Sequence, residues 1–442
     1  MTFGEYLREI LTEREINPTH LARSTGIKSK NEIYRLFENN CSYKKTLEMF
    51  NMISAHVEFT EEEKHKLLEL MSECKVGVSK RKAYNTLSLL YKNEEQRQEA
   101  EFSEVCGFIK KYSSGKVTVY PDVLTPSESL MLNDTIAGLD NVFVKHVVNF
   151  NTSDEMIARE LFEIITLFQN ENYEFFESTF RGFFDTFLIA ENNGDYMIAI
   201  YDKHKFYEGR IAREAAEIIE KKCSELFYNT SKEKNGKVSD YIDIINFSAC
   251  ADINNIYSLY GMQCMGDISY DVMESLFEDA DFCGFPRNHP YVSKFLQAVN
   301  ERECLRKKSQ AQKRYVLSEK SVREFLKTGR TADYMSCFRE LSKEERRAFL
   351  NKFLEKTEGA EHLGRFFGDG FSEILTECVY IENTGIFLSS TGKGFDKVSQ
   401  NALITHPKAQ AVFSGFCKWF WDNCTYSEEE SAKKLKALME NI

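Results

Sequence analysis

Proline, long apolar runs and paired cysteines are all scarce in this chain of 442 residues, and each shortage excludes a class of protein. Only six Pro are present, which argues against a disordered or collagen-like chain, and 42% apolar with 29% charged residues is typical of a foldable one. No stretch approaches 18 consecutive apolar residues, and the first residues have no basic segment leading into an apolar one. We therefore expect neither a membrane-spanning nor a secreted protein, but a cytoplasmic one.

Signatures of catalysis and of metal binding are also missing. The 12 Cys include no CxxC pair, so we interpret them as reduced thiols, mostly in the core. No HExxH or GxSxG motif is present, and Gly392-Lys393-Gly394 lacks the spacing of a phosphate-binding loop. Cys264, Cys283 and His289 are separated by intervals that match no common zinc pattern. The sequence thus predicts no enzyme, no catalytic residue, no cofactor and no metal site.

Charge is divided unevenly between the start of the chain and the rest. Residues 1–92 carry 15 Lys and Arg against 13 Asp and Glu, whereas the whole chain carries 57 against 69. Phosphate backbones repel an acidic body. Within residues 19–45 only Glu32 and Glu38 are acidic, and the basic side chains are Arg23, Lys28, Lys30, Arg35, Lys44 and Lys45. If any part of the chain binds nucleic acid, the charge pattern favours this segment.

Residues 1–72 have the patterning of a small helical bundle. Apolar residues between Phe3 and Leu11 recur at three- and four-residue spacing, which predicts a first helix. Asn17-Pro18 is a start signal for a second helix, and Gly26 tolerates the positive φ that ends it. The capping box Ser29-x-x-Glu32 predicts a third helix. Two short helices joined by a glycine turn are typical of a helix-turn-helix motif.

The segment from Leu21 to Ile27, followed by Ile33 to Leu36, resembles the Xre or Cro/CI repressor-type DNA-binding domain. The resemblance continues through a fourth helix and the capping box Thr60-x-x-Glu63 to about residue 72. It departs between Gly26 and Ile33, where this chain is one residue longer than the family spacing, so the start of the third helix is reset. The resemblance implies that the third helix lies in the major groove and that the start of the second meets phosphates.

Mapped onto this sequence, the resemblance gives two sets of DNA-binding candidates. The candidate base or groove readers are Lys30, Asn31, Tyr34 and Arg35. Asn can pair with adenine edges and Arg with guanine edges, which is why these residue types suit that role. The candidate phosphate contacts are Thr19, Lys28, Lys44 and Lys45. Two alternatives stay open: a solvated face of a small bundle, and a helical module that binds protein.

The rest of the chain alternates strand and helix signals. Asn193-Gly194 lies between two β-branched runs and predicts a hairpin with a type I′ turn, followed by an amphipathic helix. The same order recurs at residues 378–388, before a helix rich in Phe. We expect a multi-domain protein with an all-α N-terminal domain and a large mixed α/β (α+β) body of two related hairpin-plus-helix lobes. The expected divisions are 1–75 for the helix-turn-helix domain, 76–116 for a helical connector, 117–230 for the first lobe, 231–360 for a mainly helical middle segment and 361–442 for the second lobe.

The second lobe resembles the phospholipase-D-like sensor halves of some transcription regulators. It departs from the catalytic His-x-Lys-x-x-x-x-Asp motif, because Phe413 stands where Asp is needed after His406 and Lys408. The resemblance therefore implies a binding fold without catalysis.

These features together predict a bacterial-type, one-component transcription regulator of the Xre type. Its N-terminal domain is expected to bind double-stranded DNA at an inverted-repeat operator, as a homodimer, because one small domain contacts too little DNA for tight specificity. The acidic body is expected to dimerise and to sense a small molecule or peptide, whose binding residues are unknown. The alternative is an enzyme or effector protein whose N-terminal module recruits a protein partner.

Overall fold

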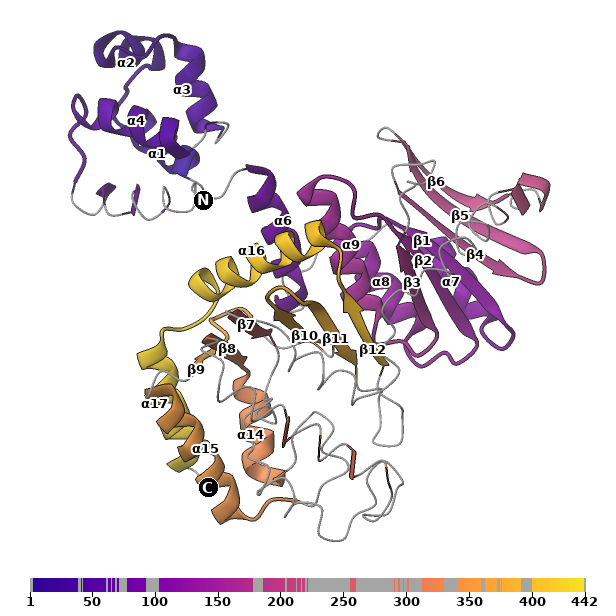
Figure 1. Cartoon of the computed structure of the whole chain (residues 1–442). Coiled ribbons are helices and arrows are strands. Elements are labelled where there is room, and N and C mark those ends of the chain that lie inside the picture. Colours follow the sequence, from indigo (N-terminus) through magenta and orange to yellow (C-terminus); the bar gives the residue numbers. More distant parts are fainter. Residues whose placement is uncertain are drawn as a thin grey trace. The chain divides into compact units, whose positions relative to one another are not determined.

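A computed structural model shows how the chain is organised (Figure 1). It describes residues 3–38, 43–60, 78–92, 103–177, 186–202, 205–211, 255–259, 312–329, 340–358, 362–371, 376–390 and 400–440, with isolated residues between these ranges. The chain divides into two compact units, Met1–Lys82 and Ala83–Ile442, the second of which is called the body. Among the described helices, none combines the length and the apolar character that crossing a membrane requires.

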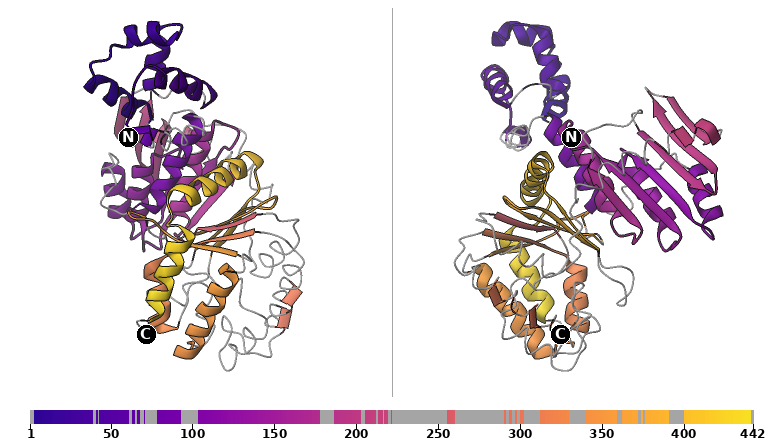
Figure 2. Two further views of the ribbon diagram at one scale, coloured as in Figure 1. Left: turned by 90° about the vertical axis from the view of Figure 1, so that its left-hand side faces the viewer. Right: turned by 45° about the vertical axis from the view of Figure 1, so that its right-hand side comes forward.

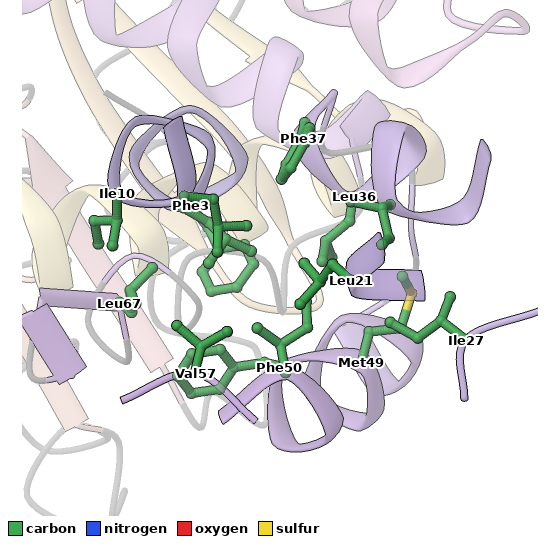
Figure 3. Close-up of a cluster of buried hydrophobic side chains, with 14 of the residues drawn as sticks. Phe3, Ile10, Leu21, Ile27, Leu36, Phe37, Met49, Phe50, Val57 and Leu67 are labelled. Atoms are coloured by element: carbon green, nitrogen blue, oxygen red, sulfur yellow. The ribbon is translucent and has the colours of Figure 1, made fainter. Parts of the chain in front are cut away.

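The N-terminal unit is built from short amphipathic helices around one apolar core. Its described helices are α1 (Phe3–Glu13), α2 (Pro18–Thr25), α3 (Lys30–Phe37) and α4 (Tyr43–Ser54). Buried side chains from every helix meet in this core (Figure 3), among them Phe3, Leu21, Leu36 and Phe50. Helix α3 contacts α1 and α2, and α2 also contacts α4. One apolar stripe on each helix therefore accounts for the packing of the unit.

The start and the end of α2 follow the predicted backbone chemistry. Asn17 Oδ1 accepts a hydrogen bond from the Thr19 N–H at 2.8 Å, and Pro18 is the first helical residue. Gly26 ends the helix with φ +74°, a conformation that glycine adopts without a steric penalty. The local sequence thus sets the length of α2 and the direction of the chain as it enters α3.

The two predicted capping boxes of this unit have different outcomes. Ser29 is the residue before α3 and has extended backbone angles, but its side chain accepts no capping hydrogen bond, so this prediction was wrong. Glu32 instead forms an ion pair with Lys45, which competes for the carboxylate. The second box is confirmed: the Thr60 N–H donates to Glu63 Oε2 at 2.7 Å, and the Glu63 N–H donates to Thr60 Oγ1 at 3.2 Å.

The body contains two six-stranded sheets with the same topology. Their strand orders are β3-β2-β1-β4-β5-β6 and β9-β8-β7-β10-β11-β12. In each sheet the first three strands of the chain are mutually parallel, and the following three are antiparallel to their neighbours. The prediction of a mixed α/β body with several sheets and helices is confirmed.

The first lobe is the first sheet with three helices packed side by side. Its strands are β1 (Val117–Asp122), β2 (Val142–Val148), β3 (Tyr173–Glu177), β4 (Thr186–Asn192), β5 (Asp195–Asp202) and β6 (Lys205–Arg210). Its helices are α7 (Ser103–Tyr112), α8 (Pro126–Ile136) and α9 (Asp154–Leu167). Helix α8 contacts both α7 and α9, and α7 also contacts β4, β5 and β6.

Local signals in this lobe explain where its elements begin and turn. Asn193 and Gly194 have φ +50° and +85°, so the hairpin between β4 and β5 has the predicted type I′ turn. Thr125 and Glu128 form the capping box that starts α8. Ser153 caps α9 by accepting from the Met156 N–H.

The second lobe is the second sheet with helices on both faces (Figure 2). Its strands are β7 (Asn255–Leu259), β8 (Gln312–Leu317), β9 (His362–Phe366), β10 (Thr376–Ile381), β11 (Gly385–Ser390) and β12 (Gln400–Ile404). Its helices are α14 (Glu319–Thr328), α15 (Lys343–Glu358), α16 (Pro407–Asn423) and α17 (Glu428–Glu440). Helix α16 crosses one face, against β10 and β11, and the other three helices lie on the opposite face.

The structure corrects two of the expected divisions. Strands β7 and β8 fall within 231–360, which we expected to be mainly helical, so the second lobe extends at least from Asn255. Helix α7 falls within the expected connector 76–116, yet it packs on the first sheet and is part of that lobe. Both errors have one cause, because contacts with distant parts of the chain assign these elements to their lobes. Strand β7 is also only five residues long, which makes its sequence signal weak.

The segment that leads from the N-terminal unit to the sheets of the body packs on the body. It forms α6 (Val78–Ser88) and the 3-10 helix η1 (Leu89–Tyr91). The ring of Tyr91 is fully buried, with its centroid 5.1 Å from that of Phe420 on α16. Tyr84 packs against Trp419 of the same helix, with the ring centroids 6.1 Å apart. Aromatic packing thus fixes Tyr84 and Tyr91 of the expected connector on the body.

We predict that Gly4→Ala destabilises the N-terminal unit by roughly 1–3 kcal/mol, the usual effect of overpacking. A Cβ atom at Gly4 would collide with the backbone carbonyl oxygens of Leu36 and Phe37, which cannot move like side chains. Hydrogen exchange of the α1 amides in the full-length protein measures the change.

Gly107→Ala is the matched control, because Gly107 is also helical but has nothing within 4 Å of its Cβ position. This change should stabilise the body by about 0.5–1 kcal/mol, since alanine favours helix over glycine. Equal effects of the two substitutions would show that crowding at Gly4 is not the cause.

Candidate nucleic-acid interface

Six of the eight predicted DNA-binding residues are exposed along α2, the turn after it and α3. Thr19 lies in the first turn of α2 and Lys28 in the turn between the helices, and the four on α3 are Lys30, Asn31, Tyr34 and Arg35. Lys45 on α4 is partly buried, and the side chain of Lys44 lies outside the described residues. The structure therefore brings the candidate readers together on one short helix.

Helix α3 has two chemically distinct faces. Ile33, Leu36 and Phe37 are buried in the core of the unit. Tyr34 is 45% exposed, and its ring packs edge-on against Phe37 with the centroids 6.2 Å apart. The contact with a buried neighbour orients the Tyr34 ring while much of it stays accessible. An oriented aromatic ring beside Arg35 can make apolar contacts with a ligand in addition to polar ones.

One acidic side chain lies among these cations. Glu32 forms an ion pair with Lys45, which links α3 to α4. The hydrogen bond from Lys45, together with the positive charges of Lys45, Lys28 and Arg35, holds the pKa of Glu32 below its usual value although burial opposes the shift. Glu32 is therefore ionised at neutral pH and neutralises Lys45, whereas Lys28 and Arg35 leave the face with a positive balance.

The group of side chains best suited to hold a metal ion among the described residues lies elsewhere, in the core of the first lobe. His146 on β2 and Glu160 and Glu163 on α9 each offer one ligand atom, and these atoms all lie within 4.8 Å of one another. We expected no metal site, because these residues are far apart in the sequence. Two signals were present: strand alternation places His146 with the buried Val144 and Val148, and the two Glu are three residues apart on a helix.

Burial and mutual repulsion shape the ionisation of this cluster. Burial lowers the pKa of His146, but the charges of Glu163 and Glu160 outweigh it and raise that pKa above its usual value. Burial raises the pKa of Glu163 to about 7, and the charge of Glu160 adds to this although His146 opposes it. Near neutral pH Glu163 is therefore protonated in part, which relieves some of the negative charge that the cluster buries.

The other residues that the sequence analysis considered do not form a site in the described part of the chain. Cys264, Cys283 and His289 lie outside the described residues. His406 precedes the first residue of α16, and its Nε2 lies 3.5 Å from Glu177 Oε1 at the end of β3. Its ring packs on Phe150, with the centroids 5.6 Å apart.

Comparison with known proteins gives little support for any assignment. No family model matches the chain, and no curated protein matches it significantly. A solved structure of phosphatidylserine synthase from Haemophilus influenzae Rd KW20 aligns over 82% of this chain and 98% of its own, at 10% identity and a TM-score of 0.26. A likeness at that TM-score carries no argument about the function of this chain.

The expectation that the chain is not an enzyme is nevertheless corrected. The solved structure just named is that of an enzyme, and we withdraw the expectation. No catalytic residue is assigned in its place.

We predict that Lys45→Ala raises the pKa of Glu32 toward its ordinary value, because the hydrogen bond from Lys45 is the largest cause of the lowering. A carboxyl whose pKa is lowered by folding stabilises the fold above its unfolded pKa, and this contribution disappears as the pH falls through the folded pKa. Carboxyl NMR titration measures the shift.

Glu63 is the internal control for this titration. The pKa of its carboxyl is also lowered, but by the Thr60 N–H first and by Arg14, so Lys45→Ala should leave it unchanged. A Glu32 titration that is the same in both proteins would remove the ion pair from the explanation.

Proposed function

We propose that this chain is a sequence-specific transcription regulator of the Xre type, whose N-terminal unit binds DNA through a helix-turn-helix motif formed by α2 and α3. The observation that carries the proposal is the exposed set on α3, where Asn31, Tyr34 and Arg35 stand clear of a core that buries the opposite face. A regulator of this kind acts in the cytoplasm of a bacterial cell.

The dimensions and chemistry of α3 support this role. An α-helix with its side chains is about 10–12 Å in diameter, and the major groove of B-DNA is about 12 Å wide, so a short helix such as α3 can enter it. Arg35 has the planar fork that pairs with a guanine edge, and Asn31 has the amide that pairs with an adenine edge. Thr19 at the start of α2 and Lys28 in the turn are exposed on either side of Gly26 and suit contacts with phosphates.

The charge distribution supports the same assignment. Residues 1–92 carry 15 Lys and Arg against 13 Asp and Glu, whereas the acidic balance of the chain belongs to the remaining residues, which phosphate backbones repel. In this proposal the body pairs two chains, so that two α3 helices read half-sites about 34 Å apart. A small molecule or peptide bound by the body changes the spacing of the two N-terminal units. It does so because its affinity differs between dimers that hold these units at different spacings.

The test begins with fragmented genomic DNA from the source organism. Fragments retained by the full-length protein are sequenced, and an enriched inverted repeat is the expected result. Retention of no fragment would oppose the proposal and favour the alternative, a module that recruits a protein partner.

We predict that Arg35→Ala weakens binding to that operator by about 1–3 kcal/mol and relaxes the preference at one base pair. Fluorescence anisotropy on operator variants measures both effects. Arg8→Ala is the control, because it removes the same charge from an exposed position on α1. Equal losses in the two variants would mean that Arg35 contributes only charge.

We predict a different effect for Lys28→Ala. A phosphate contact carries no sequence information, so affinity should fall by a similar factor on operator and on unrelated DNA. The slope of log K against log salt concentration should decrease by about one unit. A slope identical to that of the unmodified protein would remove Lys28 from the phosphate contacts.

A further inference from the structure

The core of the first lobe holds three ionisable side chains that DNA binding does not use. The exposed fractions of His146, Glu160 and Glu163 are 0%, 1% and 0%. Ionised groups are found at such depth only when they are paired, hydrogen-bonded or bound to a metal ion. The three side chains, called the buried triad below, therefore need a partner of compensating charge.

The backbone explains why the triad converges. Side chains alternate along β2, so His146 lies on the same buried face as Val144 and Val148. Glu160 and Glu163 are three residues apart on α9 and therefore lie on one face of that helix. Strand and helix are both regular elements with packed cores, which makes the placement of the three side chains rigid.

The separations fit a shared metal ion. His146 Nε2 lies 3.2 Å from Glu160 Oε2 and 3.7 Å from Glu163 Oε2. Ligand atoms about 2.1 Å from one ion are about 3.0 Å apart in an octahedral site and about 3.4 Å apart in a tetrahedral one. The two separations from His146 Nε2 lie close to these values, and the ligand atoms of the two Glu lie within 4.8 Å of each other.

Atoms of the triad that lack hydrogen bonds point to the same conclusion. Among the described residues, His146 Nε2, Glu160 Oε2 and Glu163 Oε1 are buried polar atoms without a hydrogen-bond partner. His146 Nε2 and Glu160 Oε2 face each other at 3.2 Å. Buried polar atoms are normally satisfied, so three orphaned atoms on neighbouring side chains indicate a missing ligand.

Each side chain of the triad also has a polar contact with a residue outside the triad. His146 Nδ1 lies 2.8 Å from Tyr173 Oη on β3, which suits an imidazole that donates from Nδ1 and binds a metal through Nε2. Glu163 Oε2 accepts the Leu124 N–H at 2.9 Å, and Glu160 Oε1 accepts the Asn149 N–H at 3.3 Å. Such outer contacts orient the ligands of metal sites.

Charge and ligand type identify the class of ion. Two carboxylates and a neutral imidazole carry two negative charges, which one divalent cation neutralises in the dry core. An imidazole nitrogen among carboxylate oxygens suits first-row transition metals better than Ca²⁺ or Mg²⁺, which prefer oxygen ligands alone.

We propose that the buried triad of His146, Glu160 and Glu163 binds one divalent transition-metal ion of the Zn²⁺, Fe²⁺ or Mn²⁺ class, in a closed structural site that joins β2 to α9. The site is independent of the proposed DNA binding, so either one can fail without the other. The rival is a metal-free triad with an imidazolium between the carboxylates.

The full-length protein is produced in medium supplemented with Mn²⁺ or Zn²⁺ and purified without chelator. Mass spectrometry of the metal content after gel filtration should give one ion per chain. Mn²⁺ is the decisive probe, because the 12 Cys compete for Zn²⁺ but thiolates bind Mn²⁺ poorly. The loaded protein should unfold at a higher temperature than protein produced without added metal, because the ion binds only the folded state.

Two substitutions at the triad and one control separate this site from others. Glu163→Gln keeps the shape of the side chain but removes its charge, and metal content should fall at least tenfold. Tyr173→Phe keeps all three ligands and removes the hydroxyl behind His146, so affinity should fall about 10–100-fold. His406→Gln removes a histidine of the same unit outside the triad, and metal content should not change.

The outcomes distinguish the proposal from its rival. Mn²⁺ retained at one ion per chain by the unmodified protein and by His406→Gln, but lost by Glu163→Gln, establishes the site. If Glu163→Gln does not fold, as judged by circular dichroism, the weaker binding of Tyr173→Phe provides the same evidence. Absence of Mn²⁺ and Zn²⁺ from the unmodified protein, or equal metal content in all variants, overturns the proposal.

Discussion

Helix α9 is the constraint on which the body depends, because it is buried on almost every side. Ten of its residues are buried, among them Leu161, Phe162 and Ile165. A helix that is apolar all round must be covered all round. The first lobe supplies α8, and the second supplies α16 and β10. The Thr376 hydroxyl at the start of β10 also donates to the Ile165 carbonyl oxygen at 2.8 Å. The two lobes are therefore not separate domains on a linker, because each lobe covers a side of α9 that the other leaves open.

Helix α9 also carries two buried acidic side chains, and burying charge costs free energy. Glu160 and Glu163 lie among its apolar residues, where an apolar side chain would cost far less, so their presence needs a physical reason. The N-terminal unit shows the opposite arrangement: none of its described charged side chains is buried, and its core is apolar. One unit thus keeps its described charges at or near the surface, whereas the other encloses three ionisable side chains.

Local sequence signals made some elements of this fold predictable, whereas contacts between distant residues define the elements that were not predicted. Asn193-Gly194 and Gly26 act within a few residues, so the sequence alone indicated the hairpin and the end of α2. The Ser29 hydroxyl makes no cap because the Glu32 N–H donates to the Ser29 carbonyl oxygen instead, and the Glu32 carboxylate pairs with Lys45, 13 residues further on. Strands β7 and β8 are defined by neighbours in the sheet, and the ligand atoms of His146, Glu160 and Glu163 meet only after β2 and α9 have packed. The exposed residues of α3 were predictable as a surface, since helical periodicity separates them from the core.

The two sheets repeat one strand order, and each changes from parallel to antiparallel pairing at the same point. The strand of the second sheet that corresponds to β2 is β8, whose buried residues are Tyr315, Val316 and Leu317. The buried imidazole of β2 therefore has no counterpart of its kind among the buried residues of β8. One topology thus encloses two different cores, and among the described residues of the body only the first lobe buries carboxylates and an imidazole.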